Sequence, residues 1–252
     1  MIVMRLLTVL VGLILSVSAA YGDVVVSSGG AWYSWGASSD PMPNNAGAAG
    51  YWDNYSYDGG SGNCNIGFWL MSSITCASAP DTSSMQGPAV MPFYADATRS
   101  NPLDFTFTRE GTQYNSQLRI EIAGNRGQNV FGWYDTKSPA NLIQIFAGAA
   151  TPGATATFSP SDSFGFYLQG PGGTFTTGAQ GGQFVLFAPT TGNHLNTYYL
   201  AVEDLSLLGT TDRDYNDMFV RIDVIPEPSA YLVLCAGMAG IAWLTRRRRR
   251  EM

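Results

Sequence analysis

The densest group of residues that could do chemistry is acidic and lies near the end of the chain. Six side chains with oxygen ligands fall within fifteen positions. Crowding like charges costs free energy unless a cation neutralises them, and Ca²⁺, which takes six to eight oxygen ligands, is the natural partner outside the cytoplasm. The sequence therefore predicts a calcium site made by Glu203, Asp204, Asp212, Asp214, Asn216 and Asp217.

An alternative role for this acidic segment stays open, because Asp and Asn side chains also cap turns by hydrogen-bonding their own backbone. The spacing Asp212-x-Asp214-x-Asn216 mimics the opening of an EF-hand loop. However, Asp217 stands where that loop needs glycine, and strands rather than helices are expected on both sides. These two features exclude an EF-hand.

The acidic segment also carries a resemblance to a known family. Glu203-Asp204, a short gap and Asp212-Arg-Asp-Tyr-Asn-Asp217 precede a final alternating strand. This order resembles the DUF4114 domain, a β-rich module of bacterial surface proteins, over about residues 164–224. The resemblance implies an extracellular surface protein with a calcium site and no assigned activity.

Aromatic residues are concentrated between Ala31 and Trp69, where nine of them stand among Gly, Asn, Asp and Ser. Aromatic rings beside polar groups can stack on sugar rings and bind their hydroxyls, so Trp32, Trp35 and Trp52 are candidate carbohydrate-binding residues. The alternative is that these rings fill the core and brace turns, as aromatic residues commonly do. The sequence favours the second interpretation.

Catalytic motifs are missing from the sequence. His194 is the only histidine, and no Gly-x-Ser-x-Gly elbow accompanies it, which disfavours a Ser-His-Asp hydrolase. No cluster of His and Cys has zinc-site spacing, and no glycine-rich loop leads into Lys-Ser or Lys-Thr. We therefore expect a protein that is not an enzyme.

The last 28 residues combine three features in order. Pro226-Glu-Pro228 breaks regular structure, residues 230–245 are uncharged and largely apolar, and Arg246–Arg250 follow. As a helix, residues 230–245 would span about 24 Å, slightly less than the roughly 30 Å hydrocarbon core, with the arginines on the cytoplasmic side.

This order resembles the PEP-CTERM sorting signal over residues 225–252. The resemblance implies an exosortase partner in a Gram-negative bacterium that makes exopolysaccharide. Cleavage near Pro-Glu-Pro would follow, so that the single-pass inner-membrane precursor becomes a cell-surface or matrix protein. A plain membrane anchor remains the alternative.

The N-terminus predicts export. Arg5, the apolar run Leu6–Val17 and the small residues up to Gly22 form a signal peptide over residues 1–22, cleaved after Ala20 or Gly22. Between Asp23 and Pro228 the chain carries seven Lys and Arg against eighteen Asp and Glu, a net charge of −11. So acidic a domain is a poor nucleic-acid binder.

The exported part predicts an all-β, sandwich-like fold with one disulfide. Cys64 and Cys76 are its two cysteines, and an oxidising compartment favours their pairing. Residues 23–100 are loop-rich and aromatic-rich, while residues 101–224 contain alternating segments separated by Gly, Pro, Asn and Ser. The expected strands are 23–27, 66–71, 104–109, 117–123, 129–134, 142–146, 154–158, 164–169, 183–188, 197–202 and 218–224.

Two functions of different classes follow. The first is an exported structural or adhesive surface protein, stabilised by the disulfide and by calcium. The second is a carbohydrate-binding module for exopolysaccharide that uses the aromatic segment. A polysaccharide-active enzyme with catalytic aspartates ranks third.

Overall fold

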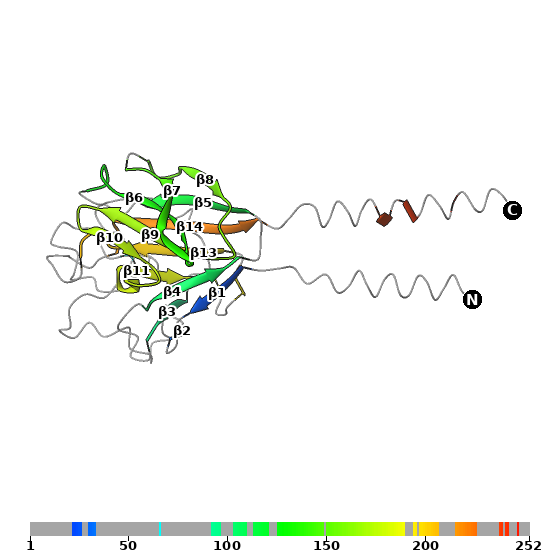
Figure 1. Ribbon diagram of the computed structural model, residues 1–252, viewed down its shortest axis with the longest axis horizontal. Coiled ribbons are helices and arrows are strands. Elements are labelled where there is room, and N and C mark those ends of the chain that lie inside the picture. Colours follow the sequence, from blue (N-terminus) through cyan, green and yellow to red (C-terminus); the bar gives the residue numbers. More distant parts are fainter. Residues whose placement is uncertain are drawn as a thin grey trace, which may run out of the picture.

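The computed structural model describes residues 22–26, 30–33, 66, 92–96, 103–109, 113–120, 125–148, 150–189, 194–195, 197–206, 215–225, 237–238, 240–241 and 246. Up to Ile225, the described residues form mainly antiparallel strands (Figure 1). The all-β prediction is confirmed. Cys64, Cys76, Trp35, Trp52, Asp212, Asp214 and Pro226–Pro228 lie outside the described residues, as does most of the predicted signal peptide.

The first sheet has the order β12-β1-β4-β9-β6-β7, and β10 also pairs with β9. Neighbouring strands in it run antiparallel. Its strands are β1 (Gly22–Val26), β4 (Phe105–Thr108), β6 (Val130–Asp135), β7 (Ser138–Phe146), β9 (Ser163–Gly170), β10 (Gly173–Thr176) and β12 (His194–Leu195).

The second sheet has the order β2-β3-β11-β13-β14-β5-β8, again antiparallel throughout. The strand β14 therefore lies in its interior, between β13 and β5. The strands are β2 (Ala31–Tyr33), β3 (Phe93–Ala95), β5 (Gln113–Ile120), β8 (Thr155–Phe158), β11 (Phe184–Phe187), β13 (Thr197–Val202) and β14 (Met218–Ile225).

Aromatic rings join the two sheets into one core. Phe107 of β4 stacks on Tyr198 of β13 with ring centroids 4.7 Å apart, and Phe164 of β9 meets Tyr114 of β5 edge-on at 5.4 Å. All four side chains are buried in the same apolar cluster. Successive side chains of a strand point to opposite faces of the sheet, so alternating aromatic residues all lie on the face that meets the other sheet. Each of these large rings buries much apolar area there.

The strand predictions are largely confirmed from Phe105 onward. Thr197–Val202 is right at both boundaries, and most other strands shift by one or two residues. The strand expected at 117–123 begins earlier, at Gln113, where its pairing with Ile225 of β14 starts. Its predicted residues 121–123 lie outside the described residues. Ile66 is the only described residue of the strand predicted over 66–71, and its backbone is helical, so that prediction is wrong there.

Four short strands were missed by the sequence: β2, β3, β10 and β12. Each has only two to four residues, which is too few to show an alternating pattern. His194 begins β12 and pairs with Asp23 of β1.

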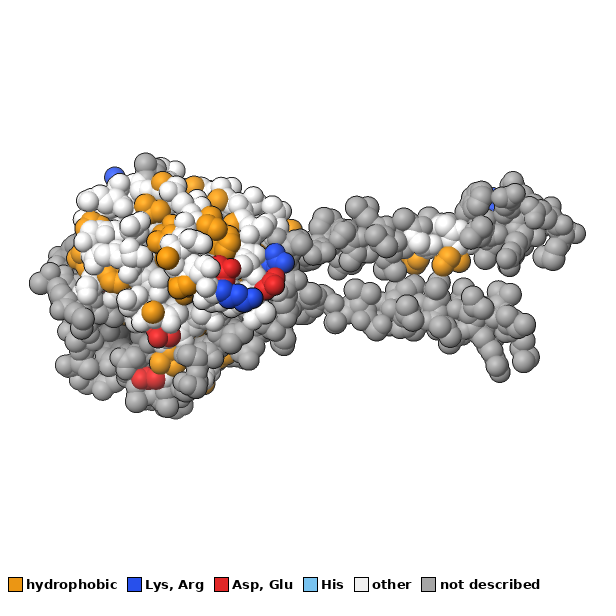
Figure 2. All heavy atoms as spheres, in the orientation of Figure 1, with side chains coloured by type: hydrophobic (Ala, Val, Ile, Leu, Met, Phe, Trp, Pro, Cys, Tyr) orange, Lys and Arg blue, Asp and Glu red, His pale blue; other side chains and the backbone are white. Residues whose placement is uncertain are grey.

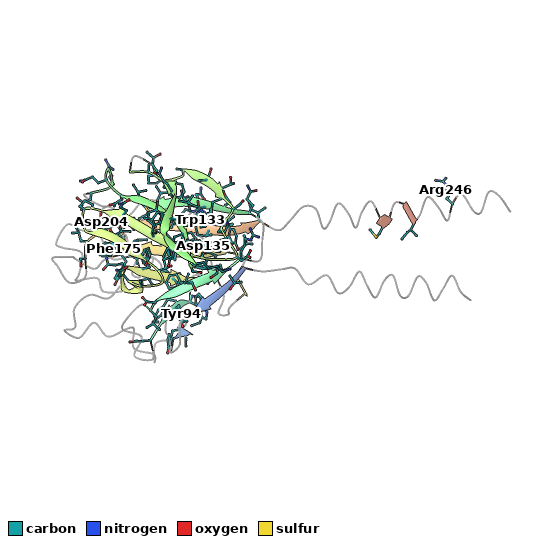
Figure 3. The ribbon with its side chains drawn as sticks, in the orientation of Figure 1. Tyr94, Trp133, Asp135, Phe175, Asp204 and Arg246 are labelled. Carbon is teal, nitrogen blue, oxygen red and sulfur yellow. The ribbon has the colours of Figure 1, made fainter. Side chains whose placement is uncertain are left out.

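The strand directions define two opposite ends of the two-sheet domain. The start of β1 and the finish of β14 lie together at one end, which we call the tail end (Gly22, Arg109, Gln113 and Ile225) (Figure 1). The finish of β13 and the start of β14 lie at the other, which we call the acidic end (Asn129, Glu203, Asp204 and Asp217). Figure 3 places Asp204 and Asp135, the last residue of β6, toward these opposite ends.

Of the predicted membrane segment 230–245, the described residues Gly237, Met238, Gly240 and Ile241 have helical backbone. Among the described residues, no helix has the length and apolar character needed to cross a membrane.

Candidate calcium site at the acidic end

The site lies where β13 ends and β14 begins. Glu203 and Asp204 follow the last residue of β13, and Asp217 directly precedes β14. A parallel bridge joins Val202 to Asn216, and the backbone N–H of Asp204 donates to Asp217 Oδ2 at 2.8 Å. The sheet register therefore brings together carboxylates that are thirteen or more positions apart in sequence.

Three of the six predicted ligands converge closely. Ligand oxygens of Glu203, Asp204 and Asp217 all lie within 4.8 Å of one another. The side chain of Glu203 is completely buried and that of Asp204 is 2 % exposed, whereas Asp217 is half-buried. Asn216 is also buried, directly precedes Asp217 and is bridged to Val202, so four predicted site residues lie where β13 ends and β14 begins. Asp212 and Asp214 lie outside the described residues.

The sequence missed a fifth polar residue of this site. Asn129, fully buried just before β6, donates from Nδ2 to Asp204 Oδ2 at 2.8 Å. Its Oδ1 atom has no hydrogen-bond partner among the described residues. Asn129 belongs to the other sheet and lies 75 positions from Asp204, so no spacing in the sequence could have linked the two.

The turn between β9 and β10 closes over the site. A Cβ atom on Gly170 would lie 2.5 Å from Asn129 Oδ1, and a Cβ atom on Gly172 would lie 2.5 Å from the carbonyl oxygen of Asp204. Real Cβ atoms do not approach other atoms so closely. Glycine at both positions therefore lets this turn lie directly on the acidic residues.

Neighbouring backbone is held in place by side-chain hydrogen bonds. Gln183 donates from Nε2 to the carbonyl oxygens of Glu203 and Leu205, at 2.9 and 2.8 Å. Tyr215 has a positive φ of 54°, which is uncommon for a bulky residue, and its hydroxyl donates to Gly182 O at 2.8 Å. The chain on both sides of the carboxylates is thus fixed, which pre-positions them.

Ionising all three carboxyl groups of the site is electrostatically unfavourable. Burial raises the pKa of Asp217 well above its ordinary value, and the nearby charges of Glu203 and Asp204 raise this pKa further. The N–H of Asp204 acts in the opposite direction, because it stabilises the ionised carboxylate. The three carboxylates together therefore carry an electrostatic cost that a bound cation would relieve.

The aromatic segment is described only in part. The Trp32 side chain is half-buried and packs against the core, with its ring edge-on to Tyr94 at 5.7 Å. The other two carbohydrate-binding candidates, Trp35 and Trp52, lie outside the described residues.

Comparison with known proteins concerns the tail. The family described as the PEP-CTERM protein-sorting motif matches residues 224–249. No curated protein matches the chain. The match confirms the sorting signal indicated by the Pro-Glu-Pro order, and it implies an exported protein that is sorted by an exosortase.

Proposed function

We propose that this exosortase-sorted protein is a structural or adhesive component of the cell surface or extracellular matrix, whose two-sheet domain is stabilised by calcium. The ion would be held by Glu203, Asp204 and Asp217. Asp212, Asp214 and Asn216 are further candidate ligands, and the likeness of residues 164–224 to the DUF4114 domain agrees with this role. No catalytic function is proposed.

The observation that supports calcium is the close approach of three carboxylates, two of them buried and the third half-buried. Isolated ionised groups are costly to bury, and structural sites that retain them pair them with cations or hydrogen bonds. Asn129 adds a buried amide oxygen beside Asp204. Carboxylate and amide oxygens are the ligands that Ca²⁺ uses.

The depth of the site favours a stabilising ion over a ligand-binding one. Glu203 and Asp204 are buried, so an ion between them would have little open coordination for a sugar hydroxyl. Asn129 directly precedes β6 of the first sheet, and the carboxylates follow β13 or precede β14 of the second sheet. A bound ion would therefore link the two sheets at the acidic end, which suits an extracellular module that must stay folded.

Thermal unfolding of the exported protein tests the calcium proposal. An ion that binds only the folded state adds about 2.7 kcal/mol at a concentration of 100 Kd. For a domain of this size that is a rise in Tm of roughly 5–11 °C. We expect this rise with calcium and its loss with a chelator, and we expect Asp214→Ala to reduce it if Asp214 is a ligand. A Tm that is the same with calcium and with chelator would leave the carboxylates as turn caps.

The sorting proposal is a membrane-anchored precursor, released by exosortase and delivered to the surface of a Gram-negative cell. Replacing Glu227 by Ala should leave uncleaved, membrane-bound precursor in a fractionation experiment. Normal processing of that variant would instead make the tail a simple anchor.

Carbohydrate binding is the alternative function. It needs exposed indole rings, and the Trp32 ring is already engaged with Tyr94 and the core. Titration with the host exopolysaccharide would test it. A saturable shift in tryptophan fluorescence would favour this alternative over the structural role.

A further inference from the structure

At the tail end, the last strand of the folded domain overlaps the start of the sorting motif. Val224 pairs with Tyr114 and Ile225 pairs with Gln113, so β14 remains in the sheet up to Ile225. The Val224 side chain is buried in the core. Because the matched motif begins at Val224, its first two residues belong to the fold.

A proline directly follows the last residue of β14 in the sequence. Pro226 has no N–H to donate, so the hydrogen bonds between β14 and β5 cannot continue regularly through it. Only residues 226–229 separate the strand from the apolar segment that begins at Ala230. From Ile225 to Ala230 there are five residue steps, which reach about 17 Å when fully extended. In the precursor, the domain is thus held within that distance of the apolar segment.

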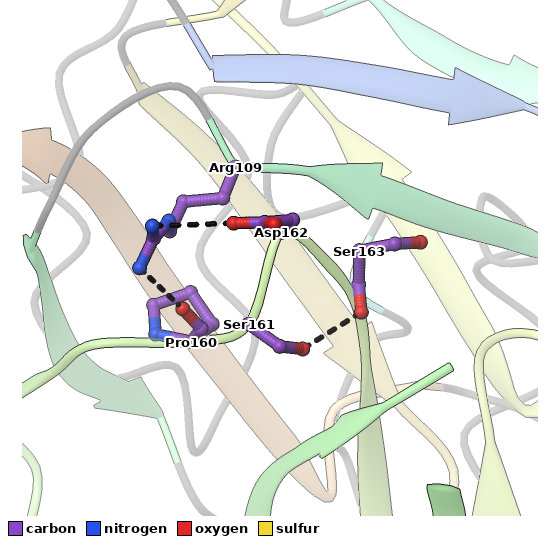
Figure 4. A network of polar contacts seen from close by, with 5 residues as sticks. All are labelled: Arg109, Pro160, Ser161, Asp162 and Ser163. Atoms are coloured by element: carbon purple, nitrogen blue, oxygen red, sulfur yellow. Dashed lines mark hydrogen bonds and ion pairs between the residues drawn. The ribbon is translucent and has the colours of Figure 1, made fainter. Parts of the chain in front are cut away.

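The tail end also presents a polar corner at Arg109, which directly follows β4. Arg109 forms an ion pair with Asp162 at 3.2 Å, and its guanidinium donates to Pro160 O at 3.0 Å (Figure 4). The backbone N–H of Arg109 donates to Asp162 O at 2.8 Å. Figure 2 shows basic and acidic side chains side by side on this end of the domain.

We propose that this tail-end surface, formed by Arg109, Gln113, Asp162 and Ile225, contacts the exosortase while the enzyme cleaves. This inference rests on the proposed sorting function and adds the enzyme's docking face. The enzyme must work within four residues of a folded domain, so it meets the surface around Ile225. The same geometry protects the chain up to Ile225, and the cut falls on the C-terminal side of that residue.

A bulky substitution beside the motif provides the test. Gln113 is exposed and directly opposite Ile225, so Gln113→Trp places a large side chain next to the motif and keeps a residue with good strand propensity. Gln144→Trp is the matched control, since Gln144 is also an exposed strand residue but lies on β7 of the other sheet. Processing of the full-length precursor is followed by pulse–chase.

We expect Gln113→Trp to slow processing about tenfold and Gln144→Trp to leave the rate unchanged, with equal Tm for both. Inserting twelve Gly and Ser residues between Ile225 and Pro226 should restore the rate of Gln113→Trp, because such a linker spans roughly 20 Å. Wild-type rates for Gln113→Trp, or slow processing that the linker does not restore, would overturn the proposal.

Two further measurements separate this proposal from the sorting route itself. A photo-crosslinking residue at position 113 should form an adduct with the exosortase, identified by its mass, and adducts with lipid alone would overturn the docking face. Mass spectrometry of the released protein should give a C-terminus beyond Ile225, and a cut upstream would also overturn it. Normal processing of Glu227→Ala would refute the sorting route whatever happens at position 113.

Discussion

The two ends of the domain handle charge in opposite ways. At the acidic end, Glu203, Asp204 and Asp217 share one small, largely buried space. At the tail end, acidic and basic residues stand in pairs near solvent, as in Arg109–Asp162 at 3.2 Å and Arg221–Asp223 at 2.9 Å. Asp162 has 81 % of its side chain exposed.

The two groups of charged residues should differ in how strongly a bound cation stabilises them. Exposed pairs are already neutralised and screened by water, so they contribute little to stability and gain little from a cation. Buried like charges repel one another strongly because little water screens them, so a cation that binds among them changes their free energy. We therefore expect perturbations to be large and calcium-dependent at the acidic end, and small and salt-dependent at the tail end.

The largest expected effect is a change in the packing of the acidic end. Gly172→Ala would place a Cβ atom 2.5 Å from the backbone oxygen of Asp204, so the turn between β9 and β10 must move away. Such overpacking typically costs about 1–3 kcal/mol. Denaturant unfolding should show this loss, while Gly127→Ala, whose Cβ atom would have only an ordinary contact at 3.7 Å, should stay close to wild type.

The same substitution made at both ends gives the sharpest comparison. In chelator, Asp217→Asn should raise the free energy of unfolding, because it removes a like charge held close to Glu203 and Asp204 and keeps an oxygen for the Asp204 N–H. It should also lose most of the calcium-dependent rise in Tm. Asp162→Asn removes one partner of an exposed ion pair, so it should lower the free energy of unfolding by no more than about 1 kcal/mol and leave the calcium response unchanged. Equal calcium responses in the two variants would place the ion elsewhere.

The pH dependence follows from the raised pKa of Asp217. The folded state holds the Asp217 proton more tightly than the unfolded chain, whose Asp pKa is about 3.9. Without calcium, this group's contribution to stability is therefore complete below that pH and is lost as the pH rises through the folded-state pKa. Tm measured in chelator from pH 4 to 8 should fall for this reason, and the decline should be smaller in Asp217→Asn.

The smallest effect is expected at the tail end. Arg109→Gln removes the ion pair with Asp162 and the bond to Pro160 O. Partly exposed pairs of this kind contribute about 0.2–1 kcal/mol and weaken in salt. The difference from wild type should shrink between low and high ionic strength. A loss that salt does not change would mean that Arg109 acts through packing instead.

The sequence contains the alternation that defines the long strands, and hence the all-β class. Residues such as Phe105 and Phe107 alternate visibly, and their side chains do face the core. Short strands such as His194–Leu195 carry no such pattern, because pairing with β1 rather than local preference fixes them.

The candidate site also combines residues that are close in sequence with residues that the fold brings in from elsewhere. Glu203, Asp204, Asn216 and Asp217 are close in sequence, so their clustering could be predicted from spacing alone. Asn129 and Gly172 reach them from distant strands, because the packing of one sheet on the other decides those contacts. The PEP-CTERM signal was fully predictable, since linear order alone defines it.

The interior position of β14 has a mechanical consequence. Any tension between a contact at the acidic end and a C-terminal attachment would pass lengthwise along this strand, which is hydrogen-bonded to β13 on one side and β5 on the other. Load in that direction shears many bonds at once, whereas load across a strand opens them one by one. A chain that leaves from the finish of a central strand is thus suited to bear pulling forces.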